Sequence, residues 1–369
     1  MKILACEENI LNPVGGGELS FETLLRVLNG KNEVFAIGKR SSRSHESLFE
    51  AKSIPVFETN THMFNKLLVF KQIERAVEKN ILKQEPDIVI TQQDYSAPAI
   101  KAANRHRIPS VVFMRNYEHF CLCADPQRNC SRKCSECYGY SMINPYRYFV
   151  NTVFRYEKKW IPKASLVISN SHYMSKIVRD WFNIDSFVIY PFVNEPKLEY
   201  YEPEYITMVN ASKHKGIDTF LNIAKRMPDK KFLVVGHNPE FIDFSQYENV
   251  RYIPWIDNSK VIYSNTKILL VPSIWPEPFG RVCVEAGYCG IPSIASKIGG
   301  LPEAVGKGGI VINQHLNVND WINAINLLYD ESIYKEYSEK ARIHSMKFNL
   351  DTIITQFKDL VKNQVDITV

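Results

Sequence analysis

Short runs of apolar and β-branched residues alternate along the chain with longer segments that are apolar on one side only. In the first half, the short runs are Lys2–Cys6, Glu33–Ile37, Asp87–Thr91, Ser110–Met114 and Ser165–Ser169. In the second half, they are Phe187–Tyr190, Tyr205–Val209, Lys231–Val235, Ile268–Pro272, Ser293–Ala295 and Ile310–Ile312. Runs of this length without clean alternation predict strands buried on both faces, and the segments between them predict crossover helices. The pattern is typical of an α/β protein.

The two series of strands predict two Rossmann-like doubly wound domains that face each other across a ligand cleft. We place the first domain at residues 1–185 and the second at 186–349, with a C-terminal helix in 350–369 as a candidate to pack back on the first. The expected crossover helices include Glu18–Leu28, Lys66–Lys83, Tyr173–Trp181, Ile217–Met227 and Val282–Cys289.

Composition agrees with this picture and narrows it. The 369 residues are 45 % hydrophobic and 23 % charged, which excludes a disordered or low-complexity chain and suits about two domains. The N-terminus turns acidic at Glu7 and Glu8, too soon for a signal peptide, and no run of about 18 apolar residues occurs. We therefore expect a cytoplasmic protein without a membrane span.

Positive charge is concentrated in one stretch. The net charge is +5, and residues 101–168 hold 12 basic and 4 acidic side chains, which indicates an anionic partner near the first domain. Within this stretch, Tyr138–Trp160 mixes aromatic and cationic residues, a composition that suits peripheral contact with an anionic inner membrane face. The alternative is a helix that packs its rings into the first domain.

One loop and the helix after it carry the most informative chemistry. Pro276 and Pro278 flank Glu277 and restrict its backbone, and a helix is expected to begin after Gly280. Glu285 then lies early in that helix, whose free amides can receive an anion. Because carboxylates repel phosphate, we expect both glutamates to accept hydrogen bonds from sugar hydroxyls. Their alternative roles are a solvated loop residue and a partner of the helix dipole.

Two further loops follow predicted strands. Lys213 and Lys215 follow Tyr205–Val209, and a lysine in this place can neutralise a diphosphate leaving group. Gly15–Gly17 follows the first strand and permits a ligand to approach the backbone closely. Its spacing does not match the dinucleotide-binding pattern, which argues against a Rossmann dehydrogenase. Taken alone, each loop also fits a simple solvated connection.

Together these segments resemble the retaining glycosyltransferases of family 4, which have the GT-B fold. The family's signature is a pair of glutamates separated by seven residues, and its lysine and glycine loop also have counterparts here. The matching segments are Glu277–Ala286, Gly290–Ser296, Gly299–Glu303, Lys215–Gly216 and Gly15–Gly17. The resemblance covers nearly the whole chain and is strongest over residues 205–312.

The resemblance implies transfer of a sugar from a UDP- or GDP-linked donor, with retention at the anomeric carbon and no cofactor for catalysis. It implies that Lys215 stabilises the departing diphosphate and that Glu277 holds donor-sugar hydroxyls. The acceptor would be a glycan, a lipid-linked sugar or a small molecule. The other implied donor-binding residues are Gly16, Gly17, Asn210, Gly236, Phe279, Gly280 and Glu285, with Glu285 on the ribose and Gly236 leaving room for the nucleotide.

The sequence departs from the family at two positions. Asn210 stands where the family usually has arginine, so Lys215 is the clear cation and Lys213 a candidate substitute. Arg115 stands where many members have histidine, and His119 follows four residues later. We regard Arg115 and His119 as candidate cleft residues.

Five of the eight cysteines lie between Cys121 and Cys137. Cys123, Cys130, Cys134 and Cys137 are candidate ligands of a structural zinc, because closely spaced soft ligands fit a tetrahedral site. A redox-sensitive or disulfide-bearing loop explains the same residues equally well.

Two other functions fit parts of the chain. A zinc-stabilised nucleic-acid-binding protein would explain the cysteines and the nearby cations, and a phosphorylase-like enzyme would share the fold. Nucleic acid is not the favoured partner, because residues 169–369 carry 21 basic and 23 acidic side chains. His237 and Trp255–Asp257 are expected near the nucleotide base, but their side chains do not distinguish uridine from guanosine.

Overall fold

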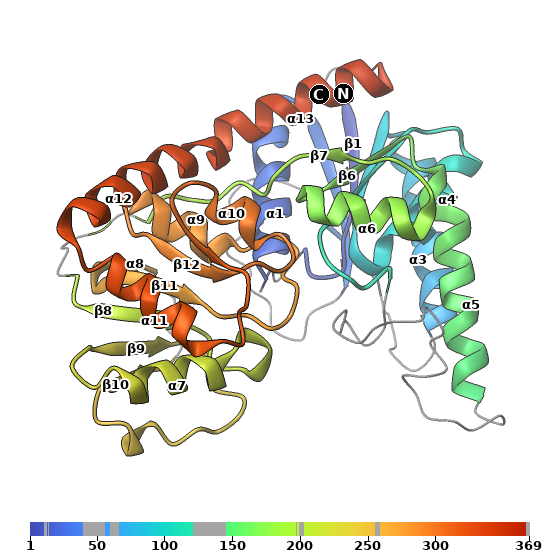
Figure 1. Ribbon diagram of the computed structural model, residues 1–369. Coiled ribbons are helices and arrows are strands. Elements are labelled where there is room, and N and C mark those ends of the chain that lie inside the picture. Colours follow the sequence, from blue (N-terminus) through green and yellow to red (C-terminus); the bar gives the residue numbers. More distant parts are fainter. Residues whose placement is uncertain are drawn as a thin grey trace. The chain divides into compact units, whose positions relative to one another are not determined.

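The chain forms two compact units (Figure 1). The first consists of Met1–Pro191 together with Ile353–Val369, and the second of Phe192–Thr352. The computed structural model describes residues 1–10, 13, 15–39, 56–59, 66–120, 145–196, 198, 203–254 and 259–366.

In the described residues, the first unit is built on a parallel seven-stranded sheet with the order β3-β2-β1-β4-β5-β6-β7. Its inner strands are apolar along most of their length because helices cover both faces. The strands are β1 (Lys2–Cys6), β2 (Glu33–Lys39), β3 (Val56–Thr59), β4 (Ile88–Gln92), β5 (Ser110–Met114), β6 (Leu166–Ser169) and β7 (Phe187–Val188).

Two features of this sheet differ from the sequence-based assignment. The sequence placed Phe187–Tyr190 in the second series, but β7 pairs with β6, with Phe187 opposite Ile168. The division between the units therefore falls after Pro191 and not after residue 185. Strand β3 was not predicted at all, because four residues at a sheet edge give little pattern to recognise.

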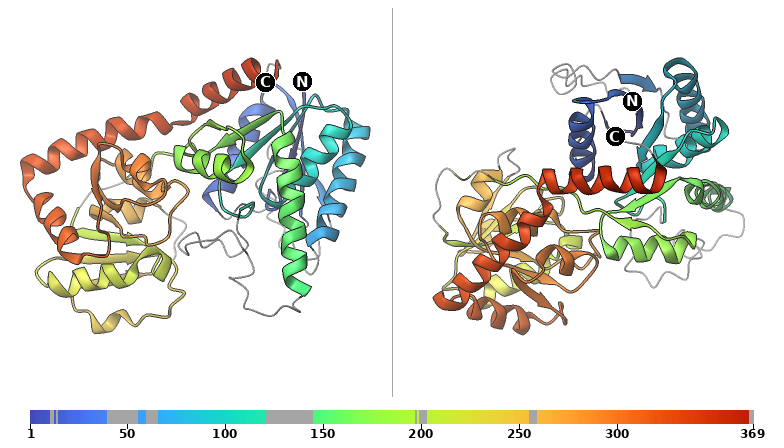
Figure 2. Two further views of the ribbon diagram at one scale, coloured as in Figure 1. Left: turned by 45° about the vertical axis from the view of Figure 1, so that its right-hand side comes forward. Right: turned by 90° about the horizontal axis from the view of Figure 1, so that it is seen from above.

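Helices pack on both faces of the first sheet. On one face, the ring of Phe113 lies 6.0 Å from Phe21 of α1 and 5.8 Å from Phe357 of α13. On the other, α3, α4 and α5 pack around Leu4 and Val89, and Figure 2 shows α5 alongside the other two. The helices are α1 (Gly16–Asn29), α3 (Lys66–Gln84), α4 (Ser96–Arg105), α5 (Pro145–Trp160), α6 (His172–Phe182) and the part of α13 (Leu350–Val365) from Ile353 onward.

The described residues of the second unit form a parallel six-stranded sheet with the order β10-β9-β8-β11-β12-β13. Its core contains the fully buried Trp321, whose indole Nε1 donates to the His315 carbonyl at 2.9 Å. The strands are β8 (Tyr205–Val209), β9 (Phe232–Val235), β10 (Val250–Ile253), β11 (Thr266–Val271), β12 (Ser293–Ser296) and β13 (Gly309–Ile312). The helices are α7 (Ile217–Arg226), α8 (Ser259–Ser264), α9 (Arg281–Tyr288), α10 (Leu301–Val305), α11 (Val318–Leu327) and α12 (Glu331–Ser345).

Strand order reverses once in each sheet. The reversal lies between β1 and β4 in the first unit and between β8 and β11 in the second. Open α/β sheets bind ligands outside the carboxyl ends of the strands at such points. The loops that follow these four strands are therefore the first places to look for a site.

Candidate functional site

In the second unit, the loops after β8 and β11 bring three predicted site residues to one edge of the sheet. Asn210 and Lys215 follow β8, and Glu277 follows β11. The two loops are joined by the backbone, because the amide of Ile274 donates to the carbonyl of His214 at 3.0 Å. The edge is therefore a single connected structure within this unit.

Lys215 and Glu277 form an ion pair, with Nζ 2.9 Å from Oε1. The hydroxyl of Ser273 donates to the same carboxylate oxygen. The Glu277 side chain is 8 % exposed and that of Lys215 is 30 % exposed. The carboxylate is thus withdrawn from water, whereas the ammonium can still reach a ligand from solvent.

A small pocket opens beside this pair. Its volume of about 30 Å³ is lined in part by Asn210, Lys215, Ser273, Glu277 and Val282. Such a volume accommodates one or two groups of the size of water, such as a hydroxyl. The arrangement presents a cation and a hydrogen-bond acceptor to a small polar group.

Asn210 acts on the backbone and does not replace the arginine usual in the family. Its Oδ1 accepts a hydrogen bond from the His237 amide at 3.0 Å. A Cβ atom on Gly236 would lie 2.4 Å from that oxygen, so the close approach of Asn210 itself requires a glycine at this position. The room for the nucleotide that the resemblance implies at Gly236 remains a prediction. Lys213, the candidate substitute cation, does not line this pocket; its side chain is 67 % exposed and its Nζ lies 4.0 Å from Glu240.

The loop that carries Glu277 is held from several sides. The Gly300 amide donates to the Glu277 carbonyl at 2.7 Å, and the ring of Phe279 is buried 5.3 Å from that of Phe348. Gly280 has a φ of 115° and directly precedes α9, as predicted for the start of that helix. These contacts fix the position of Glu277 relative to the first turn of α9.

Glu285 faces partners of its own within the second unit. Its Oε2 accepts from the Tyr263 hydroxyl at 2.6 Å, and its Oε1 lies 3.8 Å from Nε of Arg281. Burial raises the pKa of the Glu285 carboxyl, and the same burial lowers the pKa of Arg281. The contact with a ribose that the resemblance implies remains a prediction.

In the first unit, Glu18 organises the glycine loop. Its two carboxylate oxygens accept from the Gly15 amide at 2.8 Å, from Asn9 Nδ2 at 2.8 Å and from Gln93 Nε2 at 3.3 Å. These bonds tie the start of α1 to the residues that follow β1 and β4. The sequence held a signal for this role, since a glutamate at the third position of a helix typically caps its N-terminus.

Arg115 also contacts the glycine loop. Its Nη1 donates to the Gly17 carbonyl at 2.6 Å, and its guanidinium lies 4.5 Å from the Phe113 ring centre. The structure thus brings together the predicted residues Arg115, Gly16 and Gly17 at the strand-order reversal of the first sheet.

Glu7 is a buried carboxyl that the sequence analysis did not select. It follows β1 and is 1 % exposed, and its Oε1 accepts from the Asn9 amide at 3.0 Å. Burial raises the pKa of Glu7 to about 8, and the charges of Glu18 and Glu8 add to this increase. The group is therefore largely uncharged at neutral pH in the folded protein.

His119 does not lie on a surface. It is fully buried, and its Nδ1 lies 3.1 Å from Oε2 of Glu157, which is 1 % exposed. Burial opposes protonation of the ring and is the largest single influence, but the charge and hydrogen bond of Glu157 together with the charges of Glu118 and Asp94 outweigh it, so the pKa of His119 is raised. The prediction of His119 as a cleft residue is thus replaced by a buried pair, because the ring faces α5 instead of solvent.

Several predictions fall outside the described residues. They concern the candidate zinc ligands Cys123, Cys130, Cys134 and Cys137 and the base-contacting residues Trp255–Asp257. Among the residues that the structure describes, no group of three or more potential ligands is placed to hold a metal ion. Within the same residues, no helix combines the length and the apolarity needed to cross a bilayer.

The sequence missed Ser273 and Tyr263, which hold the two glutamates Glu277 and Glu285. Ser273 lies directly after a predicted strand and four residues before Glu277, a position that could have indicated its role. Tyr263 comes from α8, a helix that the sequence analysis did not identify, and no local pattern pointed to it.

Two family descriptions match the chain in succession. "Glycosyltransferase Family 4" matches residues 14–196, and "Glycosyl transferases group 1" matches residues 193–344. Each match corresponds closely to one structural unit.

Curated relatives match over shorter stretches. The chain is 30 % identical over 144 residues to N-acetyl-alpha-D-glucosaminyl L-malate synthase from Bacillus anthracis, covering 36 % of this chain and 37 % of the relative. It is 38 % identical over 91 residues to D-inositol 3-phosphate glycosyltransferase from Corynebacterium jeikeium, covering 24 % of this chain and 21 % of the relative. The chain thus matches less than half the length of these relatives.

Solved structures resemble the chain over nearly its full length. HepE from Anabaena in complex with UDP aligns with a TM-score of 0.73 and 20 % identity, covering 98 % of this chain and all of that one. Sucrose-phosphate synthase from Thermosynechococcus elongatus aligns with a TM-score of 0.72 and 18 % identity, covering 99 % of this chain and all of that one. At these identities the likeness establishes the fold, which is that of the GT-B proteins.

Proposed function

Because the chain belongs to glycosyltransferase family 4, we propose that it transfers a sugar from a nucleotide diphosphate to an acceptor and retains the configuration at the anomeric carbon. The observation that carries this proposal is the Lys215–Glu277 pair beside a small pocket in the second unit. A cation that can be offered to phosphate and a fixed acceptor for hydroxyls are the two groups that such a donor requires.

The proposed chemistry needs no separate acid and base. The bond between the anomeric carbon and the diphosphate oxygen breaks, and the acceptor oxygen bonds to the same face of that carbon. The acceptor's proton passes to the departing diphosphate. Lys215 stabilises the charge that develops on this group, and Glu277 orients the sugar through its hydroxyls. Catalysis then rests on positioning and on a preorganised charge.

The ion pair with Glu277 suits Lys215 to the role of stabilising the diphosphate. Without a ligand, its ammonium is held by Glu277 at 2.9 Å and is not free to move at random. When a diphosphate arrives, the ammonium can turn to it, while Ser273 still donates to the Glu277 carboxylate. The site is thus nearly organised before the donor binds, which lowers the entropic cost of binding.

For the donor, we propose a nucleotide sugar linked to uridine or guanosine diphosphate. The support is that HepE from Anabaena, with the same fold, has been solved in complex with UDP. For the acceptor, we propose a glycan, a lipid-linked sugar or a small molecule bound through the first unit.

The experiment is a ligand panel on the full chain. Thermal unfolding is followed with UDP, GDP and their sugars, because a ligand present at about 100 times its Kd stabilises a protein by roughly 2.7 kcal/mol. Nucleotide sugars that stabilise the protein are then tested for turnover with candidate acceptors, and the anomeric configuration of the product is read by NMR. Stabilisation by no nucleotide would refute the donor proposal, and an inverted product would refute retention. Reaction driven by orthophosphate in place of a nucleotide sugar would identify a phosphorylase.

We also propose contact with an anionic membrane face, at the end of α5. Lys159 and Lys163 lie 5.4 and 4.9 Å from the ring of Trp160, an arrangement of aromatic and cationic groups that suits a lipid headgroup layer. Co-sedimentation with anionic vesicles that weakens at high salt is expected. Absence of binding at low salt would refute this contact.

A structural zinc on the cysteine segment is likewise a proposal from the sequence. Metal analysis of the purified full chain tests it. About one zinc per chain is expected, and only a trace would leave the redox-sensitive or disulfide-bearing loop as the explanation of these cysteines.

A further inference from the structure

The outer face of the first unit carries a cavity of about 450 Å³. It lies among α3, α4 and α5, on the faces of these helices, whereas the predicted site residues of this unit follow the carboxyl ends of the strands. Its volume falls within the range typical of small-molecule sites, about 300–1,000 Å³. The family matches and the chemistry proposed above leave this cavity without a role.

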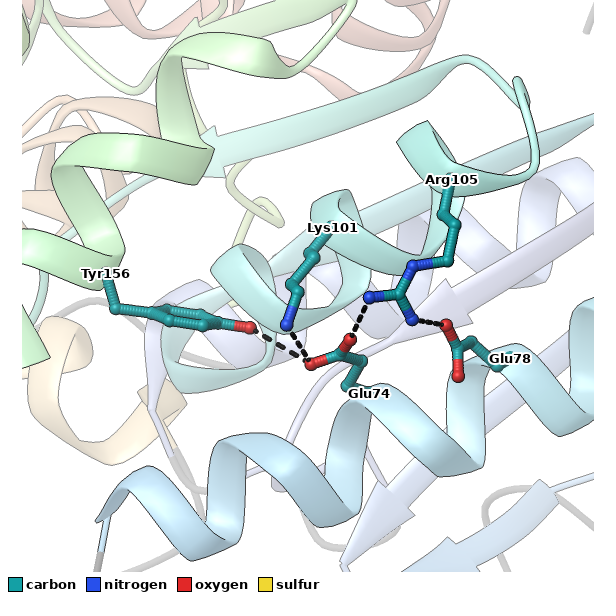
Figure 3. Close-up of polar contacts among 5 residues, drawn as sticks. All are labelled: Glu74, Glu78, Lys101, Arg105 and Tyr156. Carbon is teal, nitrogen blue, oxygen red and sulfur yellow. Dashed lines mark hydrogen bonds and ion pairs between the residues drawn. The ribbon is translucent and has the colours of Figure 1, made fainter.

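A buried carboxylate holds the floor of the cavity (Figure 3). Glu74 of α3 is 7 % exposed, and its oxygens lie 2.6 Å from Nζ of Lys101 and 3.1 Å from Nη2 of Arg105. Arg105 also pairs with Glu78, and the Tyr156 hydroxyl lies 3.5 Å from Glu74. These contacts fix two cations of α4 against α3, with one hydroxyl from α5.

Two further cations on the rim are not used by this network. Lys71 and Arg75, one turn apart on α3, are exposed and line the same cavity. In the part of the chain that the structure describes, neither has an ion pair or a hydrogen bond. The lining thus holds four cationic side chains against the carboxylates of Glu74 and Glu78. These four cations and two carboxylates leave a net charge of about +2, which an anion with a charge of about −2 would balance.

The rest of the wall is apolar or aromatic. Leu67 and Phe70 line one side, and the ring of Phe70 lies 5.2 Å from that of Tyr156. A ligand that fits both parts of the wall carries an anionic group next to an apolar or planar body. The arginines suit a phosphoryl group, because the planar guanidinium can donate two parallel hydrogen bonds to its oxygens.

We propose that this cavity is a second binding site, for a phosphoryl group attached to an apolar or aromatic body. Lys71 and Arg75 bind the phosphoryl oxygens, and the half-exposed Arg105 has donors left over from its bonds to Glu74 and Glu78. Leu67 and Tyr156, which are only partly buried, contact the body of the ligand. The site is independent of the Lys215 site and stands whether or not the proposed transfer reaction is correct.

The alternative is that the network merely clamps three helices together. The two interpretations separate at Lys71 and Arg75, because the clamp is made by Glu74, Glu78, Lys101, Arg105 and Tyr156 alone. Removing the two rim cations leaves every bond of the clamp in place. Their replacement therefore tests binding without disturbing the fold.

The test measures the affinity of phenyl phosphate for the full chain by calorimetry. The double variant Lys71→Gln with Arg75→Gln is compared with Lys31→Gln with Lys79→Gln, which removes the same charge from exposed positions of the same unit outside the cavity. We expect the rim variant to raise the Kd about tenfold or more, as for the loss of charge-assisted hydrogen bonds. The control is expected to change it less than about twofold.

A second arm distinguishes the source of the phosphoryl group. Vesicles of phosphatidylcholine with and without phosphatidylglycerol are used with the same variants. Phenyl phosphate binding lost in the rim variant supports a soluble ligand, and vesicle binding alone, lost in the same variant, supports a lipid headgroup. Absence of binding in both arms, or an equal loss in rim and control variants, overturns the proposal.

Discussion

The glycines at the two strand-order reversals serve opposite purposes. In the second unit, a Cβ atom on Gly216 would lie 1.8 Å from the Pro272 carbonyl oxygen, and one on Gly236 would lie 2.4 Å from Asn210 Oδ1. In the first unit, the nearest atoms to a Cβ on Gly15 or Gly17 lie 3.7 Å away, an ordinary contact. The protein's own packing thus requires Gly216 and Gly236 of the second unit to be glycines, whereas Gly15 and Gly17 of the first unit could each accept a Cβ atom at an ordinary contact distance.

The charged groups of the two units also differ in whether they are available to a ligand. In the second unit, Lys215 is 30 % exposed and paired with one carboxylate, so it can meet a ligand. In the first, Glu18 is occupied by three donors and Arg115 by a backbone carbonyl. The comparison indicates that the second unit supplies the charge for the proposed reaction and that the first supplies a shaped backbone.

The largest expected effect is on the stability of the second unit. Gly216→Ala places a methyl group against the Pro272 carbonyl at a φ of 81°, where side chains are strained. We expect a loss of on the order of 3 kcal/mol or more in the free energy of unfolding, measured by urea denaturation. An alanine at Gly216 that leaves stability unchanged would mean that the packing contrast between the two units is not real.

Lys215→Ala tests whether the second unit supplies the charge for the proposed reaction. We expect turnover, measured well below the melting temperature, to fall by about 10²-fold or more, because one preorganised charge is lost from the site. The melting temperature falls as well, because the Glu277 carboxylate, 8 % exposed, loses its cationic partner. Lys213→Ala is the matched control, because it removes the same charge two residues away from a side chain that is 67 % exposed. Equal losses in both variants would assign the effect to general charge and not to position.

Much of the fold could be predicted because it depends on local pattern. Runs such as Lys2–Cys6 and Tyr205–Val209 became strands with the predicted bounds, since burial on both faces requires continuous apolar residues. Two edge strands, Val56–Thr59 and Val250–Ile253, gave no such signal and were not predicted. Val56–Thr59 is held by its pairing with β2 rather than by its own composition.

The candidate site was predictable only where motifs mark it. The spacing of Glu277 and Glu285 and the turn at Lys215 pointed to one edge of the sheet, and the structure brings Lys215 and Glu277 within 2.9 Å. The buried state of His119 and the raised pKa of Glu7 were not predictable, because each depends on neighbours distant in the sequence, such as Glu157. No local rule reports such contacts.

The pH dependence of stability tests the buried carboxyl of the first unit. Glu7 has its pKa raised from 4.5 to about 8, so between these values the unfolded chain is ionised where the folded chain still holds the proton. Stability therefore falls as pH rises through this window, with a slope of up to about 1.4 kcal/mol per pH unit.

The measurement is urea denaturation at pH 5.5 and 7.5 for the wild type, Glu7→Gln and Glu8→Gln. We expect Glu7→Gln to lose less stability than the wild type over this interval, by up to about 2 kcal/mol. Glu8→Gln is the comparison variant, because that side chain is 30 % exposed and pairs with Lys39. Since the charge of Glu8 adds to the raised pKa of Glu7, a smaller change of slope than in Glu7→Gln is expected. Parallel profiles for all three proteins would show that Glu7 ionises normally.

The smallest effect on stability is expected for Gly17→Ala, which tests whether this glycine is required for packing within the protein or for binding of the donor. Gly17→Ala adds a methyl group that would meet only Arg115 carbons at 3.7 and 3.9 Å, in a helix where alanine is preferred to glycine. We expect stability to be unchanged or to rise by up to about 1 kcal/mol. If Gly17 binds the donor, as the family resemblance implies, the same methyl group should raise the donor's KM about tenfold, equivalent to about 1.4 kcal/mol. Leu19→Ala, at a position of the same helix that is 42 % exposed, is expected to leave the KM unchanged. A stable Gly17→Ala protein with the wild-type KM would show that the donor does not approach the backbone at Gly17.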